Sequence, residues 1–119
     1  GQIEGGFVQG QGWLTMEEVI WGKDGKIKTF SPSTYKIPAV TDIPKIFNVE
    51  IYKKGMNVEK VVNKAKTTGE PPLMLAMSVF FAIKDAIASI SNYQKIPDLD
   101  APATPEKILL SIKKLKNIN

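Results

Sequence analysis

The residue in this sequence best suited to chemistry is Glu70, within the stretch GEPPL at 69–73. It is a lone carboxylate between a charged, threonine-rich lead and a long apolar run. The two prolines that follow it have no N–H groups for its side chain to accept from, and Pro71 favours an extended conformation at Glu70 that directs the side chain away from the next helix. A carboxylate that loses water above an apolar segment binds a proton more readily, so these residues indicate a general base.

A purely structural role for Glu70 weighs about as much. An acid in the first turn of a helix interacts favourably with the helix dipole, by about 0.3–1 kcal/mol. Against this role, Thr67 and Thr68 lie nearby and are better suited to capping a helix. The residues alone leave both roles open.

The other polar pairs carry weaker signals. Glu17 and Glu18 are adjacent, so on a helix they would diverge by about 100° and could not face each other as an acid/base pair. Asp98 and Asp100 lie in a linker and are better explained as solvated acids, because hard cations want many oxygen ligands. The stretch GQGW at 10–13 lacks the third glycine of a dinucleotide fingerprint.

Composition excludes several classes of site. The 119 residues include no His and no Cys, so the chain cannot hold a zinc finger, a thiolate-bound iron–sulfur cluster or a Ser-His-Asp triad. We expect no metal ligands from this chain. The 16 Lys and Arg residues against 12 Asp and Glu give a net charge of +4, and the last thirteen residues hold Lys107, Lys113, Lys114 and Lys116. No aromatic residue interleaves these lysines, so we expect a solvated helix face and no nucleic-acid partner.

The pattern of apolar residues predicts an α+β fold. Residues 2–18 place Ile3, Phe7, Gly10 and Leu14 on one helical stripe. This helix is rich in glycine, and each glycine costs up to about 1 kcal/mol relative to alanine, so we expect the glycines to be buried against a close neighbour.

Strands are expected in the middle of the chain. Residues 17–30 read as a β-hairpin that turns at Asp24-Gly25, and 47–52 alternates apolar and polar residues as a further strand. Residues 53–68 read as a loop, with a short strand at 59–63 left open.

The C-terminal half is expected to be helical. From Pro71 a long helix runs to about residue 90 and is apolar on all sides as far as Ile83; such a helix is buried in something larger. We judge the apolar run too short to span a bilayer. Thr104 and Pro105 begin a last helix at 105–116. The chain starts without a lead-in and carries more apolar helix surface than its own elements need, so we expect 1–119 to be one unit of a larger domain, in a cytoplasmic protein without a membrane anchor.

Four motifs together resemble a known family. GQIEGGFVQGQGW at 1–13, PSTYKIP at 32–38, GEPPLML with SVFFAIKDAI at 69–87, and DAPATPEKI at 100–108 occur in this order and spacing near the C-terminus of the molybdenum hydroxylases, the xanthine dehydrogenase and aldehyde oxidase family. The resemblance covers the chain from Gly1 to about Ile112 and is closest to the xanthine dehydrogenase branch. It implies the C-terminal part of the molybdenum cofactor-binding domain, in its second molybdenum-binding subdomain.

The resemblance also implies roles for named residues. Glu70 matches the family's catalytic base, which activates the oxygen nucleophile that attacks an electron-poor carbon of a purine or aldehyde. Gln2 matches a hydrogen-bonding residue of the cofactor-contacting motif. Gly69 would let the loop approach the metal, and we assign Thr68 beside it to cofactor contact as well. The segment KAKTT at 64–68 departs from the family pattern, because the residues directly before Gly69 are more polar.

The implied cofactors and partners lie mostly outside this chain. The family binds molybdenum through a pterin, so its protein supplies hydrogen bonds and a base, and its 2Fe-2S and FAD domains lie elsewhere. The partners would be the remainder of the hydroxylase and a small-molecule substrate whose identity these residues do not specify. The resemblance also implies that the complete enzyme is a dimer. We expect the isolated chain to be inactive. The alternative is a non-catalytic relative that serves as a binding or interaction module.

Overall fold

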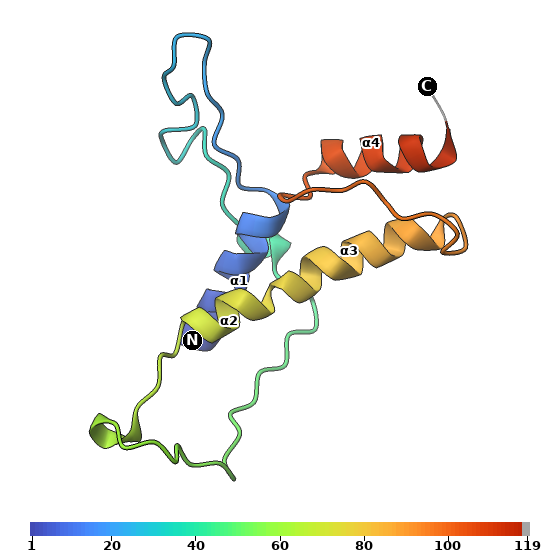
Figure 1. Cartoon of the computed structure of the whole chain (residues 1–119). Helices are drawn as coiled ribbons and strands as arrows, with labels where there is room; N and C mark the ends of the chain where they lie inside the picture. Colours follow the sequence, from blue (N-terminus) through green and yellow to red (C-terminus); the bar gives the residue numbers. More distant parts are fainter. Residues whose placement is uncertain (118–119) are drawn as a thin grey trace.

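A computed structural model describes residues 1–117, and helices make up its regular structure. The longer helices are α1 (Gln2–Thr15), α3 (Met77–Ser89) and α4 (Pro105–Lys116), with the short α2 (Glu70–Leu75) directly before α3. Two 3-10 helices, η1 (Val40–Asp42) and η2 (Val62–Lys64), lie in the connections. Figure 1 shows α2 and α3 as one nearly continuous rod, with α1 crossing its start and α4 beside its end.

The glycine-rich helix α1 packs against α2 through Gly6 and Gly10. A Cβ atom on Gly6 would lie 2.8 Å from the carbonyl oxygen of Gly69, and one on Gly10 would lie 2.3 Å from that of Leu73. The contact partner thus shifts from Gly69 to Leu73 when the glycine shifts from Gly6 to Gly10, one turn in each helix. The two helices therefore run in the same direction. The expectation of buried glycines holds for Gly10 but is wrong for Gly5, which is exposed and has no atom within 4 Å of its Cβ position.

The predicted single helix from Pro71 is divided at Ala76. Its backbone there (φ −64°, ψ −12°) ends α2 and begins α3, and its side chain is fully buried against Gly10. The stretch Glu70–Ser89 contains an 18-residue window with a mean hydropathy of 1.5, so by length and composition alone it could cross a membrane. We expected the apolar run as far as Ile83 to be too short; the stretch that passes this test is longer because it continues to Ser89. A core helix of a larger protein passes the same test.

The last helix, α4, spans the predicted residues and forms a small core with the far half of α3. Buried side chains from α3, α4 and the segment between them meet there: Ile87, Leu99, Ala103 and Leu115. Thr104 caps α4, since its side chain accepts a hydrogen bond from the Lys107 N–H group, and Pro105 occupies the first turn.

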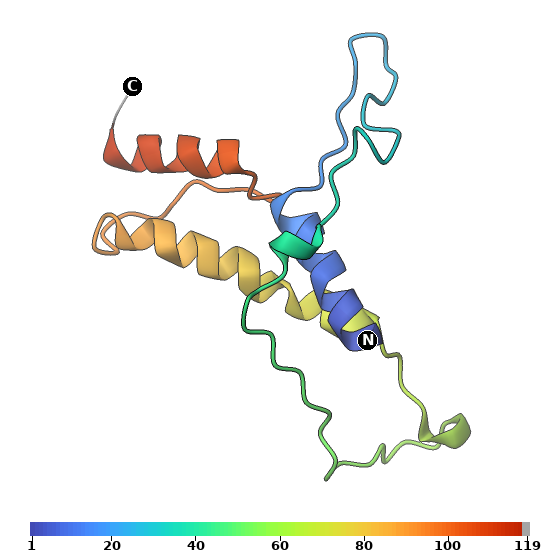
Figure 2. The same ribbon diagram turned by 180° about the vertical axis from the view of Figure 1, so that it is seen from behind.

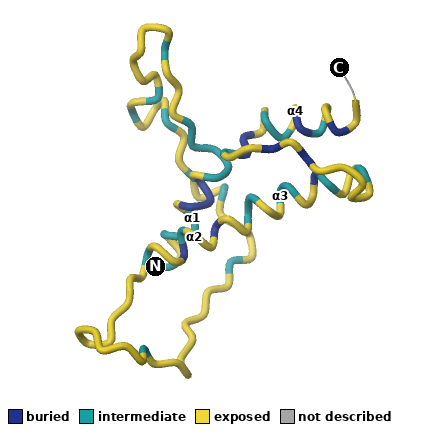
Figure 3. The backbone as a smooth tube through the Cα atoms, viewed as in Figure 1, coloured by how far each residue is buried: buried dark blue, intermediate teal, exposed yellow. Residues whose placement is uncertain are grey.

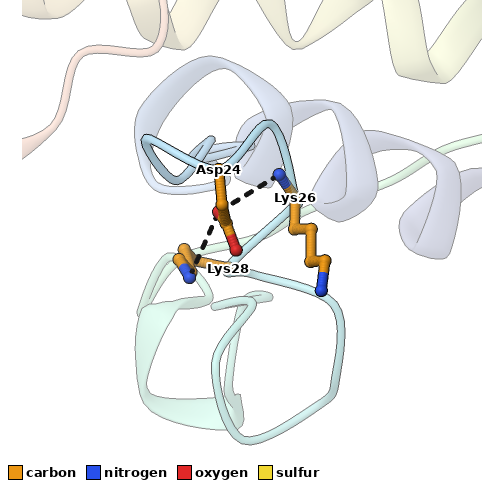
Figure 4. A network of polar contacts seen from close by, with 3 residues as sticks. All are labelled: Asp24, Lys26 and Lys28. Carbon is orange, nitrogen blue, oxygen red and sulfur yellow. Dashed lines mark hydrogen bonds and ion pairs between the residues drawn. The ribbon is translucent and has the colours of Figure 1, made fainter.

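The predicted hairpin at 17–30 is not confirmed. Its turn lies where expected, with Gly25 at φ +73°, and Asp24 organises it by accepting from the Lys26 N–H group (3.4 Å) and pairing with Lys28 (3.5 Å; Figure 4). Only one antiparallel bridge, between Trp21 and Ile27, follows within the described residues. An isolated two-stranded hairpin is marginal without a surface to pack on, and Trp21 is 63% exposed.

The strand expected at 47–52 is likewise not confirmed, and the stretch 59–63 contains the start of η2 in place of a strand. Residues 47–52 have no regular secondary structure and no bridge to another segment among residues 1–117. The two long connections, 16–39 and 43–69, project away from the helices in opposite directions in both views (Figures 1 and 2).

The described chain is open in shape. Its radius of gyration is 18.2 Å, whereas a compact domain of this length has about 13.5 Å. Its accessible surface is 9519 Å², against about 6,400 Å² for a compact monomer of this mass. Figure 3 shows buried residues on the helices and on the segment between α3 and α4, and none on the two excursions. The chain on its own therefore leaves unburied a large area that a compact protein would bury.

Candidate active site at the start of α1 and α2

Glu70 is the first residue of α2, and this corrects the expected extended conformation. The Leu73 N–H group donates to the Gly69 carbonyl oxygen (3.1 Å), which closes the first turn over Glu70. The prolines at 71 and 72 fit this turn because the first N–H groups of a helix have no partner within it. Pro72 is buried against Gly6 of α1, so α2 begins at a fixed place on α1.

The Glu70 side chain is exposed, contrary to the dry setting expected from the sequence. It forms none of the ion pairs among the described residues, and α2 has no side-chain cap. Thr68 is also exposed, and Gly69 is half-buried. The apolar residues that should have dried this acid, such as Leu75 and Met74, lie in water themselves, at 65% and 52% exposure.

The structure brings Gln2 and Glu70 to the same end of the molecule. Gly6 of α1 contacts Gly69 and Pro72 at the start of α2, and Gln2 lies one turn before Gly6 in the first turn of α1. The N-terminus of the chain lies beside the start of α2 in both views (Figures 1 and 2). Of the four residues expected in the site, Gln2, Gly69 and Glu70 thus share one end, and Thr68 is adjacent in sequence.

This end can accept a hydrogen-bonding, anionic group. The first turn of α1 leaves backbone N–H groups without partners in the helix, and the Gln2 amide adds further donors. Neither Gly5 nor Gly69 has an atom within 4 Å of its Cβ position, so both present open backbone. These donors fit a phosphate-bearing pterin better than a bare cation. Among residues 1–117 no group of three or more acidic, His or Cys side chains could hold a metal ion.

A second polar contact holds the PSTYKIP segment against the end of α1, and it was not predicted from the sequence. The Tyr35 hydroxyl donates to Glu17 Oε2 (2.7 Å). This hydrogen bond, with some burial and the negative charge of Glu17, raises the pKa of Tyr35 above its ordinary value of 10.0. Gly12 has Glu17 and Pro38 where a Cβ would stand. The sequence signals that could have pointed to this contact are Tyr35, within the PSTYKIP motif, and Glu17, just after α1.

A third contact fixes η1 on α1. The Gln11 amide nitrogen donates to the Asp42 carbonyl oxygen (2.7 Å), and Gln11 is 8% exposed. Its other amide atom, Oε1, is buried and has no partner among the described residues. The contact was not expected from the sequence, where Gln11 stood only as part of a weak glycine motif.

Comparisons with known proteins agree on one family. Residues 1–44 match the family described as molybdopterin cofactor-binding domain. The chain is 46% identical to a xanthine dehydrogenase of Oryza sativa subsp. japonica, over 93% of this chain and 9% of the relative. It is 49% identical to a xanthine dehydrogenase/oxidase of Mus musculus, over 91% of this chain and 8% of the relative. A xanthine dehydrogenase of Dictyostelium discoideum is 46% identical over 93% of this chain.

These relatives are much longer than the chain described above. The chain spans less than a tenth of the length of the curated relatives that it matches. The matched part of each relative includes the central segment 43–69, because more than nine-tenths of this chain is covered. Similar sequences therefore occur inside molecules more than ten times larger.

Proposed function

Because this chain belongs to the xanthine dehydrogenase family as a segment of its molybdopterin cofactor-binding domain, we propose that it forms one wall of the cofactor site of a molybdenum-dependent hydroxylase. In this proposal Glu70 is the general base for oxidation of a purine or aldehyde carbon with oxygen from water. The observation that supports it is the placing of Gln2 and Glu70 at one end, through the contact of Gly6 with Gly69 and Pro72.

Each residue at this end has a physical role in the proposal. Gln2 and the free N–H groups of the first turn of α1 bind anionic and carbonyl groups of the pterin. Gly69 admits the cofactor close to the backbone, because it carries no side chain and nothing fills its Cβ position. Thr68 adds a hydroxyl beside it. When bound, the molybdenum cofactor supplies the site that accepts two electrons from the substrate.

Glu70 accepts the proton of the attacking oxygen nucleophile. The short helix α2 holds its backbone, and the buried Pro72 and Ala76 hold α2 on α1. The exposure of the Glu70 side chain in this chain leaves it free to face groups supplied from outside residues 1–119. Closure by those groups would exclude water and strengthen the charge interactions in the site.

The remaining parts of the proposal concern the whole molecule. Residues 1–119 would be a single unit of the second molybdenum-binding subdomain, and the 2Fe-2S and FAD domains would lie elsewhere in the same hydroxylase. The complete enzyme would be a cytoplasmic dimer that acts on a small heterocyclic or aldehyde substrate.

The test is Glu70→Gln in the full-length protein that contains this segment. Loss of the base should lower kcat/KM for the oxidised substrate by about 10²–10⁴-fold, while molybdenum content stays unchanged. Glu59→Gln is the matched control, because Glu59 is an exposed acid in the connection that precedes α2, and it should retain full turnover. Equal turnover of both variants would refute the role of Glu70 and favour a non-catalytic interaction module.

A further inference from the structure

The two adjacent acids that follow α1, Glu17 and Glu18, contact two different segments of the chain. Both are half-buried and lie just past the end of the helix. Glu17 Oε2 accepts a hydrogen bond from the Tyr35 hydroxyl (2.7 Å), whereas Glu18 Oε1 lies 3.6 Å from Nζ of Lys107 in α4. The pair therefore joins the end of α1 both to the PSTYKIP segment and to α4.

Backbone hydrogen bonds hold these acids and the start of α4 on the last turn of α1. The N–H groups of Met16 and Glu17 both donate to the Gly12 carbonyl oxygen, at 3.0 Å each. The N–H group of Ala103, a residue only 2% exposed, donates to the Leu14 carbonyl oxygen (2.7 Å). The last carbonyl groups of a helix have no partner within it, so the segment that leads into α4 satisfies one of them. This segment meets the end of α1 in both views (Figures 1 and 2).

The contacts of the two acids lie at the opposite end of α1 from Gln2. Gly6 and Gly10 lie between the two ends, and both face α2, so they oppose motion of α1 toward α2 but not rocking across it. At 1.5 Å per residue, Gln2 and Thr15 lie about 12 Å and about 8 Å from Gly10 in opposite directions. A sideways shift of about 1 Å at Thr15 would therefore move Gln2 by about 1.5 Å.

We propose that Glu17 and Glu18 are positioning residues, which set the place of Gln2 in the proposed cofactor site by fixing the far end of α1. This inference rests on the proposed function, in which Gln2 binds the pterin. Two observations favour it over a purely local role for the acids. Their contacts join α1 to segments that are distant in the sequence, and α1 is one unbroken helix of 14 residues that transmits a displacement from end to end.

The test is amide hydrogen exchange at Ile3 and Glu4 in the full-length protein, prepared with and without the molybdenum cofactor. The N–H groups of these residues have no partner within α1, so the bound cofactor should slow their exchange in the wild type. Releasing the end of α1 lowers the fraction of molecules with Gln2 in place, and with it this slowing. Glu17→Leu should reduce the slowing by about 2- to 10-fold, the range for one intramolecular hydrogen bond. Lys107→Met should reduce it by up to about 5-fold, the range for an exposed ion pair.

Two variants separate positioning from a general loss of structure. Glu17→Gln keeps an oxygen that accepts from the Tyr35 hydroxyl, so it should retain the slowing, whereas Tyr35→Phe removes one oxygen and should lose as much as Glu17→Leu. Lys113→Met is the matched control for Lys107→Met, because Lys113 is an exposed lysine of α4 and is in none of the ion pairs among the described residues. Exchange at Ile87, in the core of α3 and α4, should stay as in the wild type.

The result for the wild type distinguishes failure of this inference from failure of the proposed function. If the cofactor slows Ile3 and Glu4 equally in the wild type, Glu17→Leu, Tyr35→Phe and Lys107→Met, the positioning role is overturned and the cofactor site stands. If the cofactor has no effect on these amides in the wild type, the start of α1 is not part of the cofactor site, and both fail. The role of Glu70 as the base is tested separately by Glu70→Gln.

Discussion

Replacing Gly10 with alanine tests whether the contact between α1 and α2 positions the start of α2. The new Cβ would lie 2.3 Å from the Leu73 carbonyl oxygen and 2.7 Å from the Ala76 Cβ. Ordinary contacts begin at 3.4 Å, so the carbonyl would have to move by about 1 Å. Overfilling a packed contact in this way costs about 1–3 kcal/mol.

Gly5→Ala is the matched control, because it makes the same chemical change in the same helix. Nothing lies within 4 Å of its Cβ position, so it should only gain helix propensity, up to about 1 kcal/mol. The same gain is present in Gly10→Ala and cancels in the comparison. The two variants should therefore differ by the contact term alone, about 1–3 kcal/mol, or about 5- to 150-fold in an equilibrium.

Hydrogen exchange of the α2 amides in the full-length protein measures this difference locally. A local measurement is needed because a large multidomain molecule has no single defined free energy of unfolding. The amides of Leu73 and Ala76 should exchange about 5- to 150-fold faster in Gly10→Ala than in Gly5→Ala. If Glu70 is the base, a displacement of about 1 Å should also lower turnover by up to about 10²-fold. Equal exchange in both variants would refute the account of the two glycines.

Three further outcomes are expected in the same protein. The hydrogen bond to Glu17 raises the pKa of Tyr35 above 10.0. The stability that this hydrogen bond contributes is therefore complete below pH 10.0 and is lost as pH rises through the raised pKa. The absorbance difference between wild type and Tyr35→Phe should show a tyrosinate midpoint above 10.0. The hydrogen bond and charge of Lys114 lower the pKa of Asp98 below 3.8. The stability that this ion pair contributes is therefore present above pH 3.8 and is lost as pH falls through the lowered pKa. Asp98→Asn should remove this part of the acid dependence of amide exchange in α4, and high salt should weaken the ion pair. Ile87→Ala, at a residue only 3% exposed, should destabilise the contact of α3 with α4 by about 2–5 kcal/mol, seen as faster exchange in both helices.

Local signals in the sequence were enough to predict α4. Thr104 as cap, Pro105 in the first turn and an amphipathic spacing all act within a few residues, and the helix begins and ends where they indicate. The same reasoning gave α1, since its apolar stripe has a helical period. The break at Ala76 had no such signal, because alanine is the best helix former and the cause is its packing on Gly10.

Apart from one bridge, the predicted strands have no partner strand among residues 1–117. Alternation at 47–52 indicates which face should be buried, but not against what, and a strand forms only when another backbone supplies its hydrogen bonds. The turn at Asp24-Gly25 was predicted correctly because turn chemistry is local, whereas the strands that flank it stay unpaired beyond Trp21 and Ile27. Tertiary context decided these elements.

The candidate site divides in the same way. The sequence indicated Glu70 through its unusual neighbours, and the structure places Gln2 near it, which spacing along the chain could not predict. The extended conformation predicted for Glu70 was wrong, because the hydrogen bond from the Leu73 N–H group to the Gly69 carbonyl oxygen makes Glu70 part of the helix. The glycines of α1 were expected to lie against a close neighbour. Gly6 and Gly10 do lie against α2, whereas Gly5 faces open space.

The exposure of Glu70 and the membrane-like composition of Glu70–Ser89 share one physical cause. Only 17% of this apolar stretch is buried within the described chain, because α1 and α4 cover opposite ends of the rod and leave side chains such as Met77 and Phe81 in water. An acid at the tip of a helix can be dry only if the helix beside it is covered. If Glu70 is the base of the proposed function, the dry setting it requires must come from the same surfaces that cover α2 and α3. Its chemistry and the burial of these two helices would then depend on one set of contacts.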